Sequence, residues 1–219
     1  MFNLIISTLF PATCVLCRKD SSYLCESCEN ELEKNTKIIS SDGQSFAKYN
    51  YNNKKIKKLL FKIKYYNNPN LAVALGEHCR DFVLSHIESF DDFILVPVPI
   101  SEARLIKRSY NQAEKISLGL SQEKTQNILT RSKDTHKLNS TTSIDSRKNE
   151  LENSMSVDLD VLNNLELYYK NKNGLEIKNL KVMIIDDITT SGATYYEARR
   201  ALMTAGFDSK NIYFFALAH

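Results

Sequence analysis

The sequence contains no long hydrophobic run. Across its 219 residues, no stretch approaches the roughly 18 consecutive apolar residues of a membrane-spanning helix, so we expect no transmembrane segment. Residues 1–10, MFNLIISTLF, are apolar but lack the basic residues and the small-residue cleavage site of a secretory signal peptide. We interpret them as a short apolar helix that packs on the body of the protein, and we expect a cytoplasmic location.

A strong charge of either sign is also absent. Lys and Arg together number 29 against 26 Asp and Glu, which gives a net charge of +3. The molecule as a whole is therefore no polycation, and any binding of nucleic acid must depend on where the basic residues lie. The sequence also shows neither an internal repeat nor a coiled-coil heptad. With 42% hydrophobic and 25% charged residues, it has the composition of an ordinary globular protein.

Cysteine is scarce, and four of the five cysteines lie in one short segment, CVLCRKDSSYLCESC. The segment contains two C-x2-C pairs, and two such pairs can complete a tetrahedral metal site. A reducing cytoplasm disfavours disulfides, and the lack of a surrounding βαβ pattern disfavours a redox pair. We predict a structural zinc site, with an iron–sulfur or redox site as the alternative. The predicted ligands are Cys14, Cys17, Cys25 and Cys28, whereas Cys79 is expected to be a buried small hydrophobic residue.

Hydrophobic patterns in the rest of the chain alternate between those of helices and those of strands. In KKIKKLLFKIKYY, apolar residues follow the i, i+3, i+4, i+7 spacing of an amphipathic helix, at Ile56, Leu59, Leu60 and Ile63. FILVPV is instead a continuous apolar run, typical of a strand that is buried on both faces. Expected helices cover residues 25–34, 54–66, 71–89, 111–121 and 193–205, and expected strands cover residues 93–98, 127–130, 182–185 and 212–217.

Three further segments complete this organisation. SSDGQSFAKYNY places an Asp-Gly turn between two short strand-like runs, which predicts a hairpin. Residues 131–147 are polar without an apolar period and are interpreted as a mobile loop. Residues 159–178 are rich in Asn and Lys and are interpreted as a peripheral insertion. Because strands joined through helices form parallel sheets, the pattern predicts an α/β fold, with a zinc module at residues 1–36 and a larger domain at residues 37–219.

The segment KVMIIDDITTSGAT, residues 181–194, carries the clearest chemical signal. An apolar strand runs into Asp186 and Asp187 and then into a loop of hydroxyls with one glycine. Ligands of open α/β sheets bind beyond the carboxyl ends of strands, and N–H groups at the start of a helix bind phosphate. The aspartates would repel that phosphate, so we expect them to accept hydrogen bonds from vicinal hydroxyls or to bind a metal. The expected phosphate-binding residues are Thr189, Thr190, Ser191, Gly192, Ala193 and Thr194.

This combination resembles the phosphoribosyl pyrophosphate (PRPP) motif of type I phosphoribosyltransferases. That motif is an apolar strand, two acidic residues and a loop similar to T-T-G-x-T. Here it reads IIDDITTSGAT, with Ser191 at the place of the usual second threonine. The resemblance implies a phosphoribosyltransferase-like parallel sheet flanked by helices, with PRPP or a related ribose phosphate as ligand. It also implies that Mg2+ binds with PRPP at Asp186 and Asp187.

A second segment, VPVPISEARLIKRSYNQA, resembles the VPVP…R…RGFNQA signature of the ComF family of competence proteins. The four cysteines and a basic helix that ends in lysine, here Lys62 or Lys64, also fit this family. The resemblance therefore extends from Cys14 to the last strand. It implies a role in DNA uptake during natural transformation, with DNA-uptake proteins as partners.

Some positions depart from the family patterns. Ser109-Tyr110 replaces the usual Gly-Phe, which keeps the aromatic ring but stiffens the loop, and THKL at residues 135–138 replaces the usual T-x-P-Q. Purine-salvage phosphoribosyltransferases often carry an acid at the position of Thr190, and a threonine cannot act as a general base at neutral pH. The sequence therefore identifies no catalytic residue.

Basic residues gather in two segments. Arg104, Lys107 and Arg108 are candidates for binding pyrophosphate, with a solvated basic turn as the alternative. Residues 51–66 contain six lysines, no acid and several aromatic rings, which suits single-stranded DNA but also a lysine-rich exposed face of a helix. The ComF resemblance favours DNA. The candidate DNA-binding residues are Lys54, Lys55, Lys57, Lys58, Lys62, Lys64, Tyr65 and Tyr66.

Two functions from different classes follow. The leading hypothesis is a ComF-like protein that handles single-stranded DNA during uptake and carries a PRPP-binding domain. The alternative is an active phosphoribosyltransferase of nucleotide salvage or metabolism.

Overall fold

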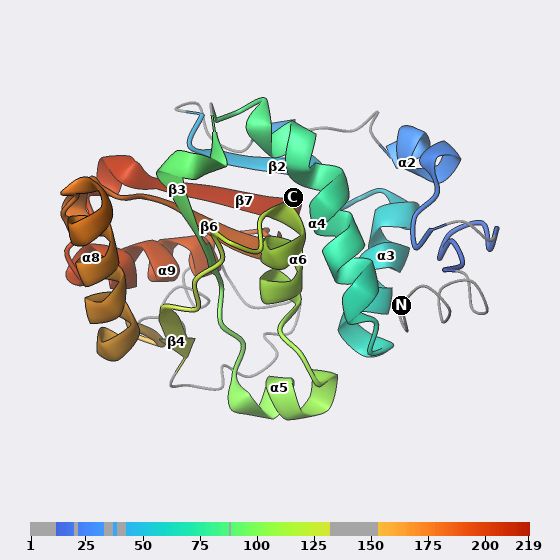
Figure 1. Ribbon diagram of the computed structural model, residues 1–219. Helices are drawn as coiled ribbons and strands as arrows, with labels where there is room; N and C mark the ends of the chain where they lie inside the picture. Colours follow the sequence, from blue (N-terminus) through green and yellow to red (C-terminus); the bar gives the residue numbers. More distant parts are fainter. Residues whose placement is uncertain (1–11, 20–21, 33–36, 39–42, 88, 132–152) are drawn as a thin grey trace, which may run out of the picture.

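The computed structural model describes residues 12–19, 22–32, 37–38, 43–87, 89–131 and 153–219 (Figure 1). The apolar segment at residues 1–10 and nearly all of the loop predicted at residues 131–147 lie outside these ranges. Within the described residues, no helix is both long and apolar enough to cross a membrane.

A five-stranded sheet forms the centre of the protein, with the strand order β1-β2-β7-β6-β3. Strands β2, β7, β6 and β3 are parallel, and only β1 pairs antiparallel to its neighbour. The predicted α/β fold class is therefore confirmed. The bounds are β1 (Lys37–Ile38), β2 (Ser45–Tyr49), β3 (Phe93–Pro97), β6 (Lys181–Ile188) and β7 (Ile212–Ala218).

Helices cover both faces of this sheet (Figure 1). A separate two-stranded antiparallel ribbon of β4 and β5 lies beside α9. The bounds are α2 (Glu26–Leu32), α3 (Lys54–Tyr65), α4 (Pro69–Leu84), α5 (Glu102–Arg108), α6 (Gln112–Leu120), α8 (Leu159–Asn173), α9 (Ala193–Thr204), β4 (Leu129–Arg131) and β5 (Met155–Val157).

Alternating side chains of the strands divide the interior into two hydrophobic cores. Along β6, Met183 and Ile185 belong to the core that contains α3, α4 and α6. Val182 and Ile184 belong to the other core, which contains α8 and α9. Since successive side chains of a strand point to opposite faces, this is the pattern of a central strand that is buried on both sides. It explains why the strand segments read as continuous apolar runs.

Two glycines allow α4 and α6 to touch backbone to backbone. A Cβ added at Gly76 would lie 2.2 Å from the carbonyl oxygen of Ile116, and one added at Gly119 would lie 2.1 Å from that of Val73. Both distances are far below van der Waals contact. The close approach of the two helices therefore requires glycine at both positions.

The cysteine module packs on the same core as α3 and α4. Cys14, Leu24 and Leu32 are buried in one cluster with the apolar face of α3. Glu29 of α2 lies 2.8 Å from Nδ1 of His78 on α4. The module is thus joined to the larger domain by apolar and polar contacts, and a boundary at residue 36 stays a prediction.

Most predicted elements are present, with corrections at some of their ends. β1 and β2 form the predicted hairpin, but its Asp42 lies outside the described residues. We expected Pro69 to break the chain before a helix at residues 71–89, but Pro69 is the first residue of α4 and the helix ends at Leu84. Proline suits this first position because the N–H group that it lacks would have no partner within the helix.

Helices also form in two segments for which the sequence predicted none. The supposed peripheral insertion at residues 159–178 contains α8, which begins after the N-cap Asp158 and ends at Gly174 in the left-handed conformation. Its Leu162 and Leu165 are buried in the core beside α9. The turn considered for Arg104–Arg108 is α5, capped by the Ser101 side chain.

Candidate functional site

The two aspartates lie at the carboxyl end of the sheet. β6 carries Asp186 and Asp187 near its end, and the adjacent β3 extends the pairing through a bond from the Val98 N–H to the Ile185 carbonyl at 2.9 Å. This is the edge at which parallel α/β sheets bind ligands. Both aspartates are buried, although their side chains border a cavity.

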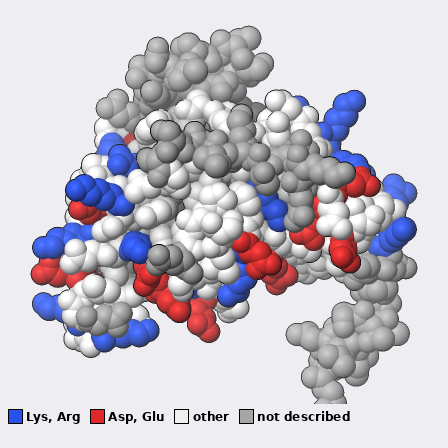
Figure 2. All heavy atoms as spheres, turned by 90° about the horizontal axis from the view of Figure 1, so that it is seen from above, with Lys and Arg blue, Asp and Glu red and all other residues white. Residues whose placement is uncertain are grey.

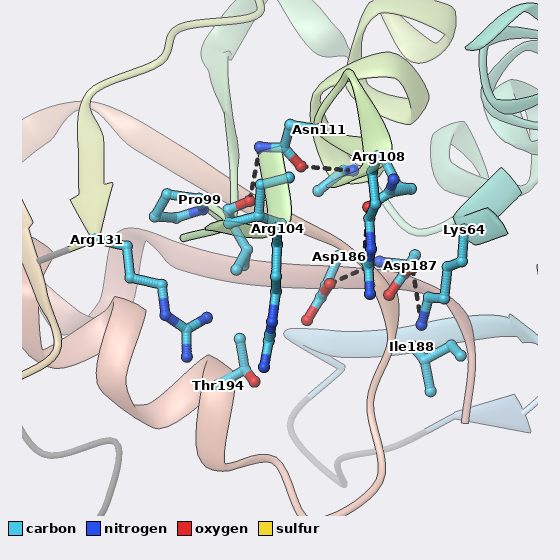
Figure 3. A pocket seen from close by; sticks show the side chains of 14 residues that line it. Lys64, Pro99, Arg104, Arg108, Asn111, Arg131, Asp186, Asp187, Ile188 and Thr194 are labelled. Carbon is cyan, nitrogen blue, oxygen red and sulfur yellow. Dashed lines mark hydrogen bonds and ion pairs between the residues drawn. The ribbon is translucent and has the colours of Figure 1, made fainter. Parts of the chain in front are cut away.

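A cavity of about 150 Å³ lies against this edge, and three arginines converge on it. Figure 3 shows that Arg104 and Arg131 extend toward Thr194, while Arg108 lies beside the aspartates. We call this cavity the acidic-pair pocket. Its lining residues are Lys64, Val98, Pro99, Ile100, Arg104, Arg108, Asn111, Gln112, Ala113, Arg131, Asp186, Asp187, Ile188 and Thr194.

The helical form of α5 selects which of the predicted basic residues reach the pocket. Arg104 and Arg108 are four residues apart and therefore project from the same side of the helix, and both line the pocket. Lys107 is exposed and lies outside the pocket lining. The structure thus brings together two of the three predicted pyrophosphate-binding residues and separates the third.

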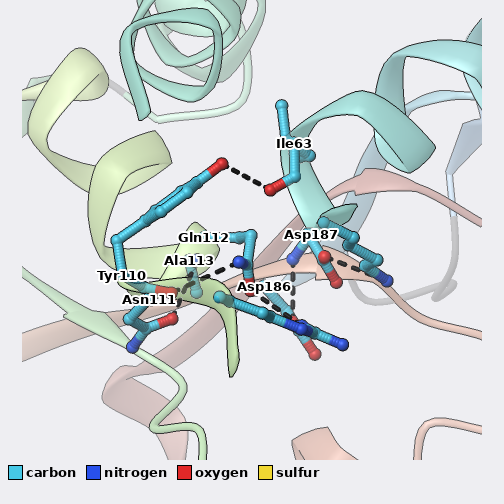
Figure 4. Close-up of polar contacts among 9 residues, drawn as sticks. Ile63, Tyr110, Asn111, Gln112, Ala113, Asp186 and Asp187 are labelled. Atoms are coloured by element: carbon cyan, nitrogen blue, oxygen red, sulfur yellow. Dashed lines mark hydrogen bonds and ion pairs between the residues drawn. The ribbon is translucent and has the colours of Figure 1, made fainter. Parts of the chain in front are cut away.

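The loop after α5 holds Arg108 in place. Arg108 donates to Oε1 of Gln112 at 2.8 Å, and Asn111 donates to the Val98 carbonyl at 3.0 Å. The Tyr110 hydroxyl donates to the carbonyl of Ile63 in α3 (Figure 4). This buried tyrosine stands where the family usually has phenylalanine, and burial raises its pKa to about 12. Helix α3 is therefore bound to the pocket loop.

The two aspartates have different electrostatic surroundings. Asp187 forms an ion pair with Lys64, whose Nζ lies 3.0 Å from Oδ2. Asp186 accepts the N–H of Asp187 at 2.8 Å. Burial, followed by the neighbouring charge of Asp187, raises the pKa of Asp186 to about 7. At neutral pH the pair therefore carries fewer than two full negative charges.

The aspartate pair fits a magnesium ion that binds together with a phosphorylated ligand. Mg2+ uses oxygen ligands and commonly takes one or two carboxylates together with substrate phosphates. Each aspartate uses one oxygen in the contacts just described, and each has a second oxygen for a metal or a hydroxyl. When bound, the ion would supply positive charge beside the phosphates.

The predicted phosphate loop lies between two cavities. Thr194 lines the acidic-pair pocket, whereas Thr189, Thr190, Ser191 and Gly192 line a second cavity of about 470 Å³. Ala193, which lies between these residues in the sequence, is buried. Gly192 is the N-cap of α9, has φ of 72° and has no side chain to cap the helix, although Oγ of Ser191 accepts the Ala193 N–H at 3.5 Å. The N–H groups of the first turn of α9 are thus suited to an anion.

The four clustered cysteines form a candidate metal centre. Their sulfur atoms all lie within 4.8 Å of one another, and the sulfurs of Cys17 and Cys25 are 3.6 Å apart. Zinc at ~2.3 Å from each of four thiolates would place the sulfurs at a similar separation. The cluster can therefore bind a metal ion such as zinc, as predicted.

The thiols of this centre differ in acidity. Burial raises the pKa of Cys28 to about 12, with further contributions from the neighbouring thiols. At Cys14 burial also raises the pKa, but hydrogen bonds from the backbone N–H groups of Cys17, Cys25 and Leu16 outweigh this effect and lower the pKa to about 6. One thiol is thus ready to ionise at neutral pH and another retains its proton until a metal displaces it.

The six lysines proposed for DNA do not form one surface. Lys64 points into the acidic-pair pocket, while Lys55 pairs with Glu31 and Lys58 approaches the Leu16 carbonyl of the cysteine module at 3.5 Å. Lys54 and Lys57 are exposed, and Lys62 is half-buried with its Nζ over the Tyr66 ring. On the face seen in Figure 2, basic and acidic residues are interspersed rather than separated by sign.

Comparison with known proteins bears on the family. No protein-family model matches the chain. The competence protein ComFC of Bacillus subtilis (strain 168) is 27% identical over 199 residues, which cover 88% of this chain and 72% of the relative. The resemblance to the ComF family is confirmed. Two of the features that resembled ComF each contribute to a compact site: the four cysteines form one cluster, and the VPVPISEARLIKRSYNQA segment supplies Arg104, Arg108 and Asn111 to the acidic-pair pocket.

Two pocket residues were missed or assigned elsewhere from the sequence. Arg131 was placed at the start of a loop but is the last residue of β4, and it borders the pocket. Lys64 was assigned to DNA, although a lysine at the end of this helix was among the features that resembled ComF proteins. That signal alone pointed to a specific role for Lys64.

Proposed function

We propose that this chain is a cytoplasmic ComF-like protein with a competence-related role, which handles single-stranded DNA and binds PRPP or a related ribose phosphate. The observation that carries the proposal is the acidic-pair pocket. Its two carboxylates suit a ribose diol and Mg2+, and the three arginines that also line it suit phosphate groups. The similarity to a competence protein supports the role in DNA uptake.

The ribose-phosphate part of the proposal is tested by calorimetry with PRPP and Mg2+. Arg104→Gln should weaken binding about tenfold or more, because a charge-assisted contact to phosphate contributes roughly 1.5–3 kcal/mol. Lys107→Gln is the matched control, since Lys107 lies on the same short helix but outside the pocket lining. Equal affinities of both variants and the unaltered protein would refute the assignment of the pocket.

The DNA part of the proposal is carried by the exposed lysines of α3. Each phosphate contact that is lost should reduce the slope of log affinity against log salt by about 0.7 for a single strand. Reversing Lys54 and Lys57 to glutamate should therefore lower both the affinity and this slope. The matched control reverses Lys170 and Lys172, which lie on α8. If both pairs of substitutions have the same effect, the response is to net charge alone and α3 has no special role.

An active phosphoribosyltransferase is the second candidate. It is favoured by the arrangement of the acidic-pair pocket, because its arginines could stabilise the pyrophosphate that leaves PRPP. Release of pyrophosphate from PRPP that depends on an added nucleobase would establish this function. Binding of PRPP without turnover across a panel of nucleobases would exclude it for those bases.

A further inference from the structure

Three aromatic side chains cluster on the surface at the end of α3. The exposed fractions are 51% for Phe61, 47% for Tyr65 and 58% for Tyr66. The ring of Phe61 lies 4.9 Å from that of Tyr65 and 5.8 Å from that of Tyr66, measured between centroids. Large apolar side chains that gather on a surface in this way commonly mark a binding site. We call these three residues the aromatic platform.

The aromatic platform adjoins the acidic-pair pocket. The guanidinium of Arg108, which lines the pocket, lies 5.9 Å from the centre of the Tyr65 ring. Lys64, the residue before Tyr65, pairs with Asp187 inside the pocket. The exposed rings of the aromatic platform therefore lie next to the basic side chains of the acidic-pair pocket.

Positive charge accompanies the rings. Lys62 Nζ lies 3.6 Å from the centre of the Tyr66 ring, and Arg108 supplies a second cation beside Tyr65. No acidic residue occurs between Tyr51 and Tyr66. Cations interleaved with exposed rings suit a ligand that has aromatic faces and negative charges, which is the chemistry of a single nucleic-acid strand.

We propose that the aromatic platform stacks unpaired bases of a single DNA strand while Arg108 holds a phosphate of the same strand at the mouth of the pocket. The proposal rests on the single-strand binding proposed above and adds where and how the bases are held. Stacking is tolerant of sequence because every base has a π-face. The platform therefore binds strands whose bases are unpaired. Stacking of these bases adds affinity that contacts between lysines and phosphates cannot supply.

Stacking is tested with two oligonucleotides of equal length and charge, oligo(dT) and the same backbone without bases. The variant with Phe61→Ala and Tyr65→Ala should bind oligo(dT) roughly tenfold more weakly or worse, since stacking contributes about 1–3 kcal/mol for each base. It should bind the abasic strand as the unaltered protein does, with the same salt dependence. Tyr168→Ala is the matched control, because Tyr168 is 53% exposed and has Lys172 over its ring, but belongs to α8.

A fluorescent reporter provides a second measurement. The chain contains no tryptophan, so Tyr65→Trp introduces a single indole into the platform and Tyr168→Trp introduces one on α8. Oligo(dT) should quench the first reporter and leave the second unchanged, and the abasic strand should quench neither.

The outcomes separate the two proposals. If the unaltered protein binds oligo(dT) and the abasic strand equally, single-strand binding stands but the platform is refuted. If the alanine variant loses affinity for both strands alike, the rings act through the structure of α3 and the platform is again refuted. If neither strand binds to the unaltered protein, both proposals fail, and a protein partner becomes the better occupant of these rings.

Discussion

Replacing Asp186 with asparagine should stabilise the protein while it removes a ligand-binding group. Asp186 is buried, and its pKa is raised from 3.8 to about 7, first by burial and then by the charge of Asp187. An asparagine has nearly the same shape, and its side-chain oxygen can still accept the N–H of Asp187. The substitution therefore removes the buried charge and preserves the packing and the hydrogen bond.

The magnitude follows from linkage between protonation and folding. Each unit by which a pKa differs between the folded and unfolded protein corresponds to about 1.4 kcal/mol. The full difference at Asp186 thus corresponds to at most about 4 kcal/mol, and we expect a gain of roughly 2 to 4 kcal/mol for Asp186→Asn above pH 7. Below about pH 4, Asp186 is protonated in both states, so the gain should vanish.

The sign is fixed by the order in which the two states lose the proton. As the pH rises from about 4 to about 7, the unfolded chain releases this proton first, so unfolding becomes progressively more favourable. Urea denaturation at several pH values, in buffers without Mg2+, measures the free energy of unfolding of both proteins. Their difference reports on Asp186 and on its coupling to the adjacent Asp187, because the remaining groups titrate alike in both proteins. A difference that stays constant across this pH range would refute the raised pKa.

Asp187→Asn provides the matched control. It removes the charge that contributes to the raised pKa of Asp186, so the decline in stability should still begin near pH 4 but should end at lower pH and be smaller. Asp187→Asn also removes the ion-pair partner of Lys64. Its free energy of unfolding above pH 7 should therefore increase by less than that of Asp186→Asn. A larger gain would mean that Asp187, and not Asp186, bears the unfavourable buried charge.

Three further predictions concern the module and the backbone. Zinc binding to the metal-free protein at pH 7.5 should release at least one proton per ion, because the pKa of Cys28 is raised to about 12. A titration with a pH indicator that shows fewer protons released per zinc ion would contradict the four-cysteine site. Ser109 has φ of 64°, so Ser109→Gly should stabilise the protein by about 1 kcal/mol. Gly174 has φ of 68°, so Gly174→Ser should destabilise the protein by a similar amount. If both substitutions shift the melting temperature in the same direction, the strain at these positions is contradicted. Gly119→Ala should destabilise by about 2 kcal/mol or more, because its Cβ would overlap the Val73 carbonyl; an unchanged urea midpoint would show that the helices can separate at little cost.

The sheet could be predicted because its signals are local. Each central strand is a continuous apolar run, and β6 leads directly into the aspartates and the loop that carry the PRPP resemblance. The C-x2-C pairs are equally local. In both cases neighbouring residues determine the geometry, so the sequence alone was sufficient to place the acidic pair at the sheet edge and the four sulfurs around one point.

The basic half of the pocket depends on contacts between distant segments. Lys64 meets Asp187 only because Tyr110 and the buried face of α3 bring the helix end to the sheet edge. Arg131 reaches the pocket from β4, which pairs with β5 across a long polar segment without a recognisable pattern. No local rule predicts either meeting. The separation of Lys107 from its neighbouring arginines was predictable, had the Ser101 cap been recognised as the start of a helix.

Helix α8 was missed for a different reason. Its buried Leu162 and Leu165 share the sequence with exposed Leu159 and Leu167, so the apolar positions do not form one clear stripe. The caps gave a better signal than the periodicity. Asp158 and Gly174 mark the two ends of the helix with residues that are typical of those positions.

Helix α3 contacts the cysteine module near its beginning, through Lys55 and Lys58, and the acidic-pair pocket near its end, through Lys64. Its length in residues is therefore fixed, because inserting or deleting one residue between Lys58 and Lys64 would turn Lys64 by about 100° around the helix axis. The charge composition of the helix would be unchanged, yet the ion pair with Asp187 would be broken. Natural variation in this helix should thus consist of substitutions and not of insertions or deletions.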